Sequence, residues 1–280
     1  MSSRQPADNG RPIPNALTIA GVDPSGGAGI LADVKAMSAL GAYGCAVIAA
    51  LTAQNTQGVT GISPVPPAFV GLQIDTLFTD VRIDAVKIGM LGQRPVIEVV
   101  AEKLAKWTPA HVVLDPVMVA KSGDLLLEND AVGAMREAML PQTTLLTPNL
   151  PEAGVLLEER PVETVKEMRR VAERLRNKLA HSGERWVLVK GGHLPGSETI
   201  DLLHDGDRMI ELPGHRIDTP NTHGTGCTLS AALAALLPQI GDTPEAAKRA
   251  KAYLTEAIRH AERLSVGSGH GPVHHFHRWW

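Results

Sequence analysis

Residues 221–228 read Asn-Thr-His-Gly-Thr-Gly-Cys-Thr, and these residue types at this spacing could bind a phosphate group. The Ala- and Leu-rich run at residues 229–237 has strong helix propensity, and its uniform apolarity predicts a helix buried on most sides. The first amides of a helix lack intrahelical partners, and Gly224 and Gly226 would let a ligand approach them closely. The segment therefore predicts an anion hole at a helix N-terminus, although an ordinary glycine turn before a core helix has the same pattern.

Cys227 would lie in the first turn of this helix, between the hydroxyl groups of Thr225 and Thr228. That position predicts a thiol whose pKa is lowered and whose thiolate is accessible. The alternative is a small buried hydrophobic residue, which is the commonest role of a free cysteine.

The surrounding sequence alternates between short apolar runs and helical segments. Buried strands are predicted at residues 16–21, 45–51, 85–90, 111–118, 143–147 and 185–190, and a hairpin of two strands at 199–204 and 208–213. Helices are predicted at residues 30–40 and 67–79, from the third strand to about Lys106, and at 163–181 and 243–264. This order predicts an α/β fold with three αβα layers and a mostly parallel central sheet covered on both faces.

Unusual polar or sulfur-containing residues follow the predicted strands at the point where each one ends. They are Asp23, Gln54, Met90, Asp115, Asn149 and Lys190. In an open α/β sheet these strand ends meet at one edge, where ligands bind. Each residue alone has an ordinary explanation as a turn or a solvated strand end, but together the six predict an active edge.

An anion hole, a lysine and several carboxylates at one edge indicate phosphoryl transfer with Mg²⁺, which depends on positioning and charge neutralisation. Asp115 and Glu152 are candidate partners for Mg²⁺ through water, because this ion keeps most of its water ligands. Lys190 could neutralise a nucleotide phosphate. Asp33 and Gln54 offer the acceptor and the donor that would recognise a neutral heteroaromatic amine, and Met90 and Val117 would supply apolar walls.

Composition limits the remaining function classes. The 280 residues are 44% hydrophobic but only 3% aromatic, and they suit an aliphatic core of one large domain. The net charge of −3 gives no basis for binding nucleic acid or an anionic membrane, and no apolar run reaches the length of a membrane span. Two cysteines without a disulfide framework fit a reducing cytoplasm. Residues 1–14 lack a signal-peptide pattern and are expected to form a flexible N-terminal arm before a single domain at 15–280.

Motifs along most of the chain resemble the hydroxymethylpyrimidine/phosphomethylpyrimidine kinases of thiamine biosynthesis, in the ribokinase-like superfamily. The motifs are Ala-Leu-Thr-Ile-Ala-Gly-Val-Asp-Pro-Ser-Gly-Gly-Ala-Gly from Ala16, Ala-Gln-Asn-Thr, Lys-Ile-Gly-Met-Leu, Leu-Asp-Pro-Val-Met, Thr-Pro-Asn-Leu-Pro-Glu-Ala, Lys-Gly-Gly-His and residues 221–232. The histidine-containing tail at residues 271–277 also resembles this family. We therefore do not interpret its histidines as a metal site or an expression tag.

The resemblance implies two phosphorylations of 4-amino-5-hydroxymethyl-2-methylpyrimidine, with ATP as donor and Mg²⁺ as cofactor, and it leaves a role for K⁺ open. It places the pyrimidine pocket at Gly21, Ala28, Asp33, Gln54, Met90, Val117 and Cys227. Independently of the resemblance, the residues themselves predict nucleotide contacts at Lys190, Thr225 and Asn149, and metal contacts at Asp115 and Glu152. The anion hole would be Gly224, Thr225, Gly226 and Cys227, with Cys227 in the position that an Asp base occupies in the sugar kinases. The family is typically homodimeric.

Several alternatives remain open on the sequence. A pyridoxal kinase shares the fold and the cysteine, and a pyrimidine-binding protein without catalysis would keep the pocket alone. A sugar kinase is disfavoured, because Cys227 replaces Asp and because too few residues separate Gly21 from the first helix to form a separate lid domain. Cover for the site is expected from loops near residues 118–127 or 193–198.

Overall fold

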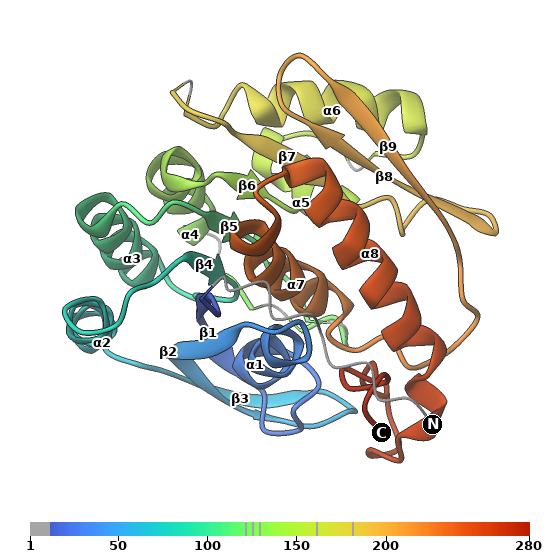
Figure 1. Ribbon diagram of the computed structural model, residues 1–280, viewed down its shortest axis with the longest axis horizontal. Helices are drawn as coiled ribbons and strands as arrows, with labels where there is room; N and C mark the ends of the chain where they lie inside the picture. Colours follow the sequence, from blue (N-terminus) through green and yellow to red (C-terminus); the bar gives the residue numbers. More distant parts are fainter. Residues whose placement is uncertain (1–11, 121, 125, 129, 161, 181) are drawn as a thin grey trace.

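The computed structural model describes residues 12–280 with the exception of 121, 125, 129, 161 and 181. These residues form a nine-stranded sheet in the order β3-β2-β1-β4-β5-β6-β7-β8-β9 (Figure 1). The parallel strands are β1 (Asn15–Val22), β2 (Tyr43–Gln54), β4 (Ala85–Ile88), β5 (Val112–Leu114), β6 (Leu145–Leu146) and β7 (Trp186–Val189). Antiparallel strands complete both edges: β3 (Val59–Pro64) beside β2, and β8 (Glu198–His204) and β9 (Met209–His215) beside β7.

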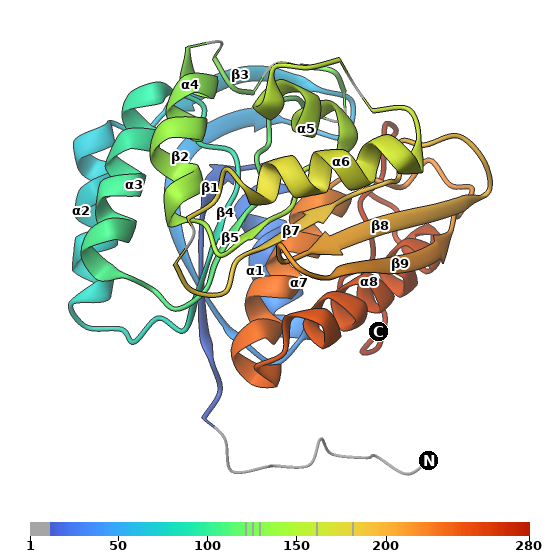
Figure 2. The ribbon, with the colours of Figure 1, turned by 90° about the horizontal axis from the view of Figure 1, so that it is seen from above.

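Helices cover the two faces of the sheet, and Figure 2 shows the resulting three layers. One face carries α1 (Gly29–Ala39), α7 (Thr225–Ile240) and α8 (Thr243–Arg259), which the short turn η3 (Ala261–Arg263) follows. The other carries α2 (Pro67–Phe78), α3 (Arg94–Trp107), α4 (Ala131–Ala134), η1 (Met135–Met139), η2 (Leu140–Gln142), α5 (Leu150–Leu157) and α6 (Val165–Arg176). Because both faces are covered, the central strands are almost continuously apolar.

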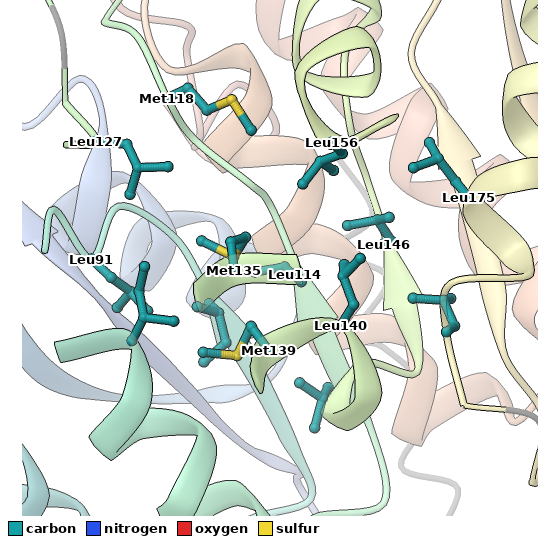
Figure 3. Close-up of a cluster of buried hydrophobic side chains, with 14 of the residues drawn as sticks. Leu91, Leu114, Met118, Leu127, Met135, Met139, Leu140, Leu146, Leu156 and Leu175 are labelled. Atoms are coloured by element: carbon teal, nitrogen blue, oxygen red, sulfur yellow. The ribbon is translucent and has the colours of Figure 1, made fainter. Parts of the chain in front are cut away.

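Successive strand residues contribute to different cores, as the two-residue period of a strand requires. Leu114 and Leu146 pack into the core beneath α3, α5 and α6, whereas Val113 and Leu145 pack against α7 and α8. Figure 3 shows part of the first core, in which leucines and methionines rather than aromatic rings fill the space between sheet and helices. The core is therefore aliphatic, as the composition predicts.

The α/β fold with a mostly parallel sheet is confirmed, and elements in three regions of the chain were not predicted. Strand β3 is mostly exposed at the sheet edge, so it lacks the apolar run that marks the buried strands. Residues 131–142 form α4, η1 and η2, a region without a predicted element. Helix α5 was also missed, although Asn149 and Glu152 form a capping box and Pro151 lies in the first turn, both of which are sequence signals for a helix start.

Two expectations concern the connections of the chain. Strand β1 and helix α1 are joined by residues 23–28, and this connection is too short to contain a lid domain, as predicted. Residues 1–11 of the predicted N-terminal arm lie outside the described residues, and the division into an arm and a single domain stays a prediction. Among the described helices, none is long and apolar enough to cross a membrane.

Candidate active site

A cavity of about 510 Å³ lies at the carboxyl ends of the central strands. Its walls come from β1, β2, the segments after β4, β5 and β7, the first turn of α5 and the first turn of α7. The predicted site residues that line it are Gly21, Ala28, Gln54, Met90, Asp115, Val117, Asn149, Glu152, Lys190, Gly224, Thr225, Gly226 and Cys227. The topology of a parallel sheet thus brings together residues that are more than 200 positions apart in the chain.

The first turn of α7 has no side-chain cap, unlike those of α5, α6 and α8. Its N-cap residue Gly224 has a φ of 76°, no side chain caps the terminus, and its first turn holds no acidic residue. By contrast, Asn149, Thr164 and Asp242 cap α5, α6 and α8. The positive end of the α7 dipole and its first amides are therefore available to an anion at the cavity.

The loop before α7 packs tightly on the loop after β1. A Cβ atom at Gly224 would collide with the carbonyl oxygen of Gly27, and one at Gly27 would collide with the His223 ring. The His223 Nε2 atom lies 2.8 Å from Asp23 Oδ2, which also accepts hydrogen bonds from Ser25 and Ala28. Burial raises the pKa of the Asp23 carboxyl, but the hydrogen bonds from His223 and Ser25 lower it overall, so Asp23 stays a carboxylate.

Residues 267–275, which we term the C-terminal segment, contact the loop before α7 and the first turn of α7 from outside the sheet. The His223 amide donates to the Gly271 carbonyl at 3.0 Å, and the His275 Nε2 atom lies 3.0 Å from the Thr228 hydroxyl in the first turn of α7. The amide of His270 donates to the Thr56 carbonyl, just beyond Gln54. The segment therefore links the anion-hole loop to the turn after β2.

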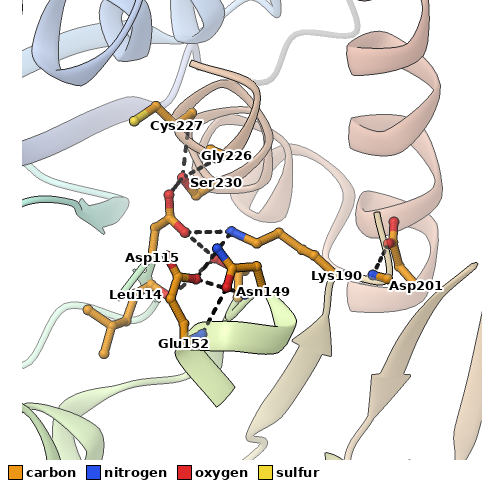
Figure 4. Close-up of polar contacts among 11 residues, drawn as sticks. Leu114, Asp115, Asn149, Glu152, Lys190, Asp201, Gly226, Cys227 and Ser230 are labelled. Carbon is orange, nitrogen blue, oxygen red and sulfur yellow. Dashed lines mark hydrogen bonds and ion pairs between the residues drawn. The ribbon is translucent and has the colours of Figure 1, made fainter. Parts of the chain in front are cut away.

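A buried ion pair forms the charged centre of the cavity. The Lys190 ammonium donates to Asp115 Oδ1 at 2.8 Å, and it lies 3.9 Å from Glu152 Oε2 (Figure 4). A Cβ atom at Gly226 would lie 3.3 Å from Asp115 Oδ2 and 3.4 Å from Lys190 Nζ, so the first turn of α7 approaches this pair closely. The anion hole and the lysine can thus contact neighbouring phosphate oxygens.

Burial changes the proton affinities of these groups. It raises the pKa of Glu152 to about 7, because the nearby Asp115 charge adds to the effect of burial while Lys190 opposes it. Burial alone would lower the pKa of Lys190, but Asp115 and Glu152 raise it overall, so the ammonium stays charged.

Asn149 and Glu152 have a structural role besides their place in the cavity wall. Glu152 Oε2 accepts the Asn149 amide hydrogen at 2.7 Å, and Asn149 Oδ1 accepts the Glu152 amide hydrogen at 2.9 Å. This capping box fixes the start of α5, so the two residues reach the cavity in a defined geometry.

The donor set suits Mg²⁺ held largely by water and phosphate. Asp115 and Glu152 supply two carboxylates, and in the described part of the chain no group of three or more His, Cys, Asp or Glu residues is placed to hold a metal ion. An ion that depends on several protein ligands does not match this set, whereas Mg²⁺ typically uses one or two carboxylates together with substrate phosphates.

Asp33 does not line the cavity, and this corrects the prediction that it contacts the substrate. Its side chain is fully buried on α1, where it accepts hydrogen bonds from Lys87 at 2.7 Å and from the Thr18 hydroxyl at 2.6 Å. Lys87, on β4, belongs to the Lys-Ile-Gly-Met motif, but the sequence gave it no role. Its pairing with a residue 54 positions away appears only in the fold.

The prediction of a lowered pKa for Cys227 is also wrong. Burial raises the pKa of its thiol to about 11, and this effect exceeds the opposing influences of the Lys87 charge and the hydrogen bond from the Gly29 amide. The sequence shows the helix N-terminus that lowers a thiol pKa, but it does not show how deeply the thiol is enclosed.

Both loops that were expected to cover the site reach the cavity. Met118, Val119, Ala120 and Leu126 line it from the segment after β5, and His193 lines it from the segment after β7. Val119 is half exposed, so this side of the wall also faces solvent.

Comparison with known proteins identifies the family. The sequence profile described as phosphomethylpyrimidine kinase matches residues 23–274. The chain belongs to the phosphomethylpyrimidine kinase family. It is 53% identical over 268 residues to the hydroxymethylpyrimidine/phosphomethylpyrimidine kinase of Escherichia coli (strain K12), covering 95% of this chain and 98% of that protein. A member of the phosphomethylpyrimidine kinase family is a phosphotransferase, and its kinase activity implies the use of ATP.

Solved structures confirm the ribokinase-like fold. An ADP complex of Bacillus subtilis pyridoxal kinase matches with a TM-score of 0.86 and 34% identity, covering 96% of this chain and 100% of that chain. A phosphomethylpyrimidine kinase from Clostridium difficile 630 matches with a TM-score of 0.77 and 38% identity, covering 88% and 99% of the two chains.

Replacing Gly224 with alanine should reduce kcat/KM by about 10²-fold, the typical cost of removing one anion-hole donor. The new Cβ atom would displace the loop from Gly27, and a φ of 76° disfavours any residue with a side chain. Steady-state kinetics measures the effect, with Gly133→Ala in α4 as the control, because a Cβ atom there meets no other atom within 4 Å. Equal activity of the Gly224→Ala and Gly133→Ala variants would contradict the assignment of the Gly224 loop to an anion hole.

Proposed function

We propose that this protein phosphorylates 4-amino-5-hydroxymethyl-2-methylpyrimidine with ATP, first to the monophosphate and then to the diphosphate, for thiamine biosynthesis. The observation that carries the proposal is the uncapped first turn of α7 beside the Lys190–Asp115 pair, in one cavity with Gln54. The relative from Escherichia coli, which carries both activities in its name, supports this substrate.

The apolar end of the cavity suits a flat ring. Gly21, Ala28, Met90 and Val117 line it, and a Cβ atom at Gly21 would lie only 2.7 Å from the Met90 sulfur. A side chain at Gly21 would therefore fill space that we assign to the pyrimidine. Gln54 would hydrogen-bond the polar edge of the ring through its amide group, which can both donate and accept.

The polar end of the cavity would hold the phosphates. Lys190 and the amides of Gly224 to Cys227 would bind phosphate oxygens, and Thr225 and Asn149 would contact the nucleotide. Asp115 and Glu152 would hold Mg²⁺ through water; when bound, the ion neutralises phosphate charge. The protein then stabilises the negative charge that grows during transfer, in a site from which much of the water is excluded.

Cys227 is the proposed base of the first step. It would take the proton of the substrate hydroxyl while that oxygen bonds to the γ-phosphorus of ATP, and the bond from this phosphorus to the ADP oxygen breaks so that ADP leaves. In the second step the acceptor is a phosphate monoester, largely ionised at neutral pH, and it needs no base.

Replacing Cys227 with alanine should therefore reduce the first phosphorylation by about 10²–10⁴-fold, the usual contribution of a general base, and the second phosphorylation much less. In the unmodified protein, the rate ratio of the first to the second step should rise about tenfold per pH unit below the thiol pKa of about 11. Single-turnover kinetics with the hydroxymethylpyrimidine and with its monophosphate measures the two rates and hence their ratio. Equal losses in both steps would leave Cys227 a positioning residue.

Phosphorus NMR of the protein with Mg-ATP and the hydroxymethylpyrimidine should show a monophosphate signal followed by a diphosphate signal. Pyridoxal is the competing substrate, because the Bacillus subtilis pyridoxal kinase shares this fold. A monophosphate alone, with pyridoxal converted as well or better, would move the proposal to a vitamin B6 kinase. Absence of any product would support a binding protein without catalysis.

We also propose that the protein works in the cytoplasm as a homodimer. Both cysteines are free, which suits a reducing compartment, and Leu51 and Ile62 are exposed on the antiparallel edge formed by β2 and β3. Sedimentation velocity should give twice the mass of one chain at micromolar concentration. A species with the mass of a single chain would contradict the dimer.

A further inference from the structure

The backbone that carries Lys190 is held by an aspartate on the neighbouring antiparallel strand. The Gly191 amide, one residue after Lys190, donates to Asp201 Oδ1 on β8 at 2.9 Å. The ladder between β7 and β8 has already ended at the pair Val189 and Leu202. A side-chain carboxylate thus accepts the backbone hydrogen bond at the point where the two strands stop pairing.

A lysine on a third element holds Asp201 in turn. The Lys251 ammonium on α8 lies 2.8 Å from Asp201 Oδ2, and it also donates to the Leu212 carbonyl on β9. The side chains of Lys251 and Asp201 are only 15% and 13% exposed, so solvent screens their attraction little. The two oxygens of Asp201 are therefore divided between a backbone amide next to Lys190 and a cation from the helix layer.

Close packing leaves this part of the backbone little room to move. A Cβ atom at Gly191 would collide with the Ile200 carbonyl oxygen, so β8 passes directly against this residue. The Lys190 amide donates to the Pro148 carbonyl at 2.9 Å, in the segment after β6. Because β7 lies between β6 and β8, the backbone around Lys190 is hydrogen-bonded on both sides.

The Lys190 side chain extends from this backbone into the cavity. Figure 4 shows its ammonium beside Asp115 and its backbone end beside Asp201. Lys190 lines the cavity, whereas Asp201 and Lys251 are not among the lining residues. Asp201 therefore influences a ligand through the backbone that carries Lys190 and not by contact.

We propose that Asp201 is a positioning residue, which fixes the backbone at Lys190 through the Gly191 amide so that the lysine ammonium meets the phosphates of the nucleotide. Lys251 holds the Asp201 carboxylate in place. The inference rests on the proposed contact between Lys190 and the nucleotide. Since a misplacement of about 1 Å can cost about 10²-fold in rate, a residue that never touches the ligand can still set how well it binds and reacts.

The test measures the affinity of the full-length protein for Mg-ADP and, separately, for 4-amino-5-hydroxymethyl-2-methylpyrimidine by calorimetry. Asp201→Ala should raise the Kd for Mg-ADP about tenfold, in the range of one hydrogen bond to a charged group. It should leave the Kd for the pyrimidine unchanged, because Gln54 and Met90 come from β2 and the segment after β4. Asp201→Asn keeps an acceptor for the Gly191 amide and should lose less affinity than Asp201→Ala. Equal weakening of both ligands, or of neither, would overturn the proposal.

Asp205→Ala is the matched control in the same hairpin. Asp205 accepts the amide hydrogens of Asp207 and Arg208 and pairs with the Arg208 guanidinium, so its removal also costs backbone hydrogen bonds and an ion pair. It lies at the turn between β8 and β9, and its removal should leave both Kd values unchanged. A similar loss of Mg-ADP affinity in Asp205→Ala would mean that any damage to the hairpin has this effect, and it would overturn the specific role of Asp201.

A double-mutant cycle with Lys190→Met tests the route through Lys190. In that background Asp201→Ala should have little further effect on the Kd for Mg-ADP, because the group that Asp201 positions is already absent. Additive losses would overturn the proposal, since Asp201 would then act by another route.

The single variants separate this inference from the proposed function. A weaker affinity for Mg-ADP in Lys190→Met, with an unchanged affinity in Asp201→Ala, would overturn the inference and leave the proposed role of Lys190 intact. An unchanged affinity in Lys190→Met would contradict both.

A second variant covers the case in which Asp201→Ala does not fold. Asp201→Leu/Lys251→Met replaces the ion pair with apolar side chains of similar volume, which is often neutral for stability. It also removes the acceptor for the Gly191 amide, and it should raise the Kd for Mg-ADP about tenfold. An unchanged Kd in the folded double variant would overturn the proposal.

Discussion

The unmet hydrogen-bonding capacity at the N-terminus of α7 is the constraint on which the site depends. Helices α5, α6 and α8 begin with a side-chain cap, but α7 begins with Gly224, and no side chain caps the amides that it presents to the cavity. The first amides of a helix need partners from outside the helix, and an anion or water in the cavity can supply them. The loop before α7 and the loop after β1 lie close together at this terminus. Gly224 and Gly27 allow this close approach, because a side chain at either residue would collide with the opposite loop.

The charges around this terminus are arranged in two pairs. Lys190 with Asp115 lies at the cavity wall, and Lys87 with Asp33 is fully buried outside the cavity lining. Each carboxylate keeps its lysine protonated despite burial, so positive charge is present in a low-dielectric region before a ligand arrives. Preorganised charge of this kind costs little reorganisation during the reaction. The buried Glu152, whose pKa is raised to about 7, can change the net charge of the cavity wall near neutral pH.

The sequence predicted the site better than it predicted the chemistry of each residue. Asp115, Asn149 and Lys190 were located correctly because the ends of parallel strands meet at one edge, whatever lies between them in the chain. Asp33 lies within a helix, where sequence spacing did not reveal that its carboxylate faces a lysine on a distant strand. The pKa of Cys227 depends on enclosure by segments far apart in the chain, and no local pattern reports that burial.

The same limits explain the missed elements. Strand β3 is exposed because it has a neighbour on one side only, so its sequence carries no apolar run. Helix α5 has only eight residues, and the apolar residues that it buries cannot be distinguished by pattern from those of a short strand. Its capping box was the available signal, and it was interpreted as ligand chemistry.

The position of the C-terminal segment has a consequence for biosynthesis. Its contacts with His223, Thr228 and Thr56 are made by residues that follow all nine strands in the chain. During translation all nine strands leave the ribosome before this segment does. The anion-hole loop receives its outer support only after release. A chain that ends before this segment would keep all nine strands but lose the contacts that hold the anion-hole loop from outside the sheet.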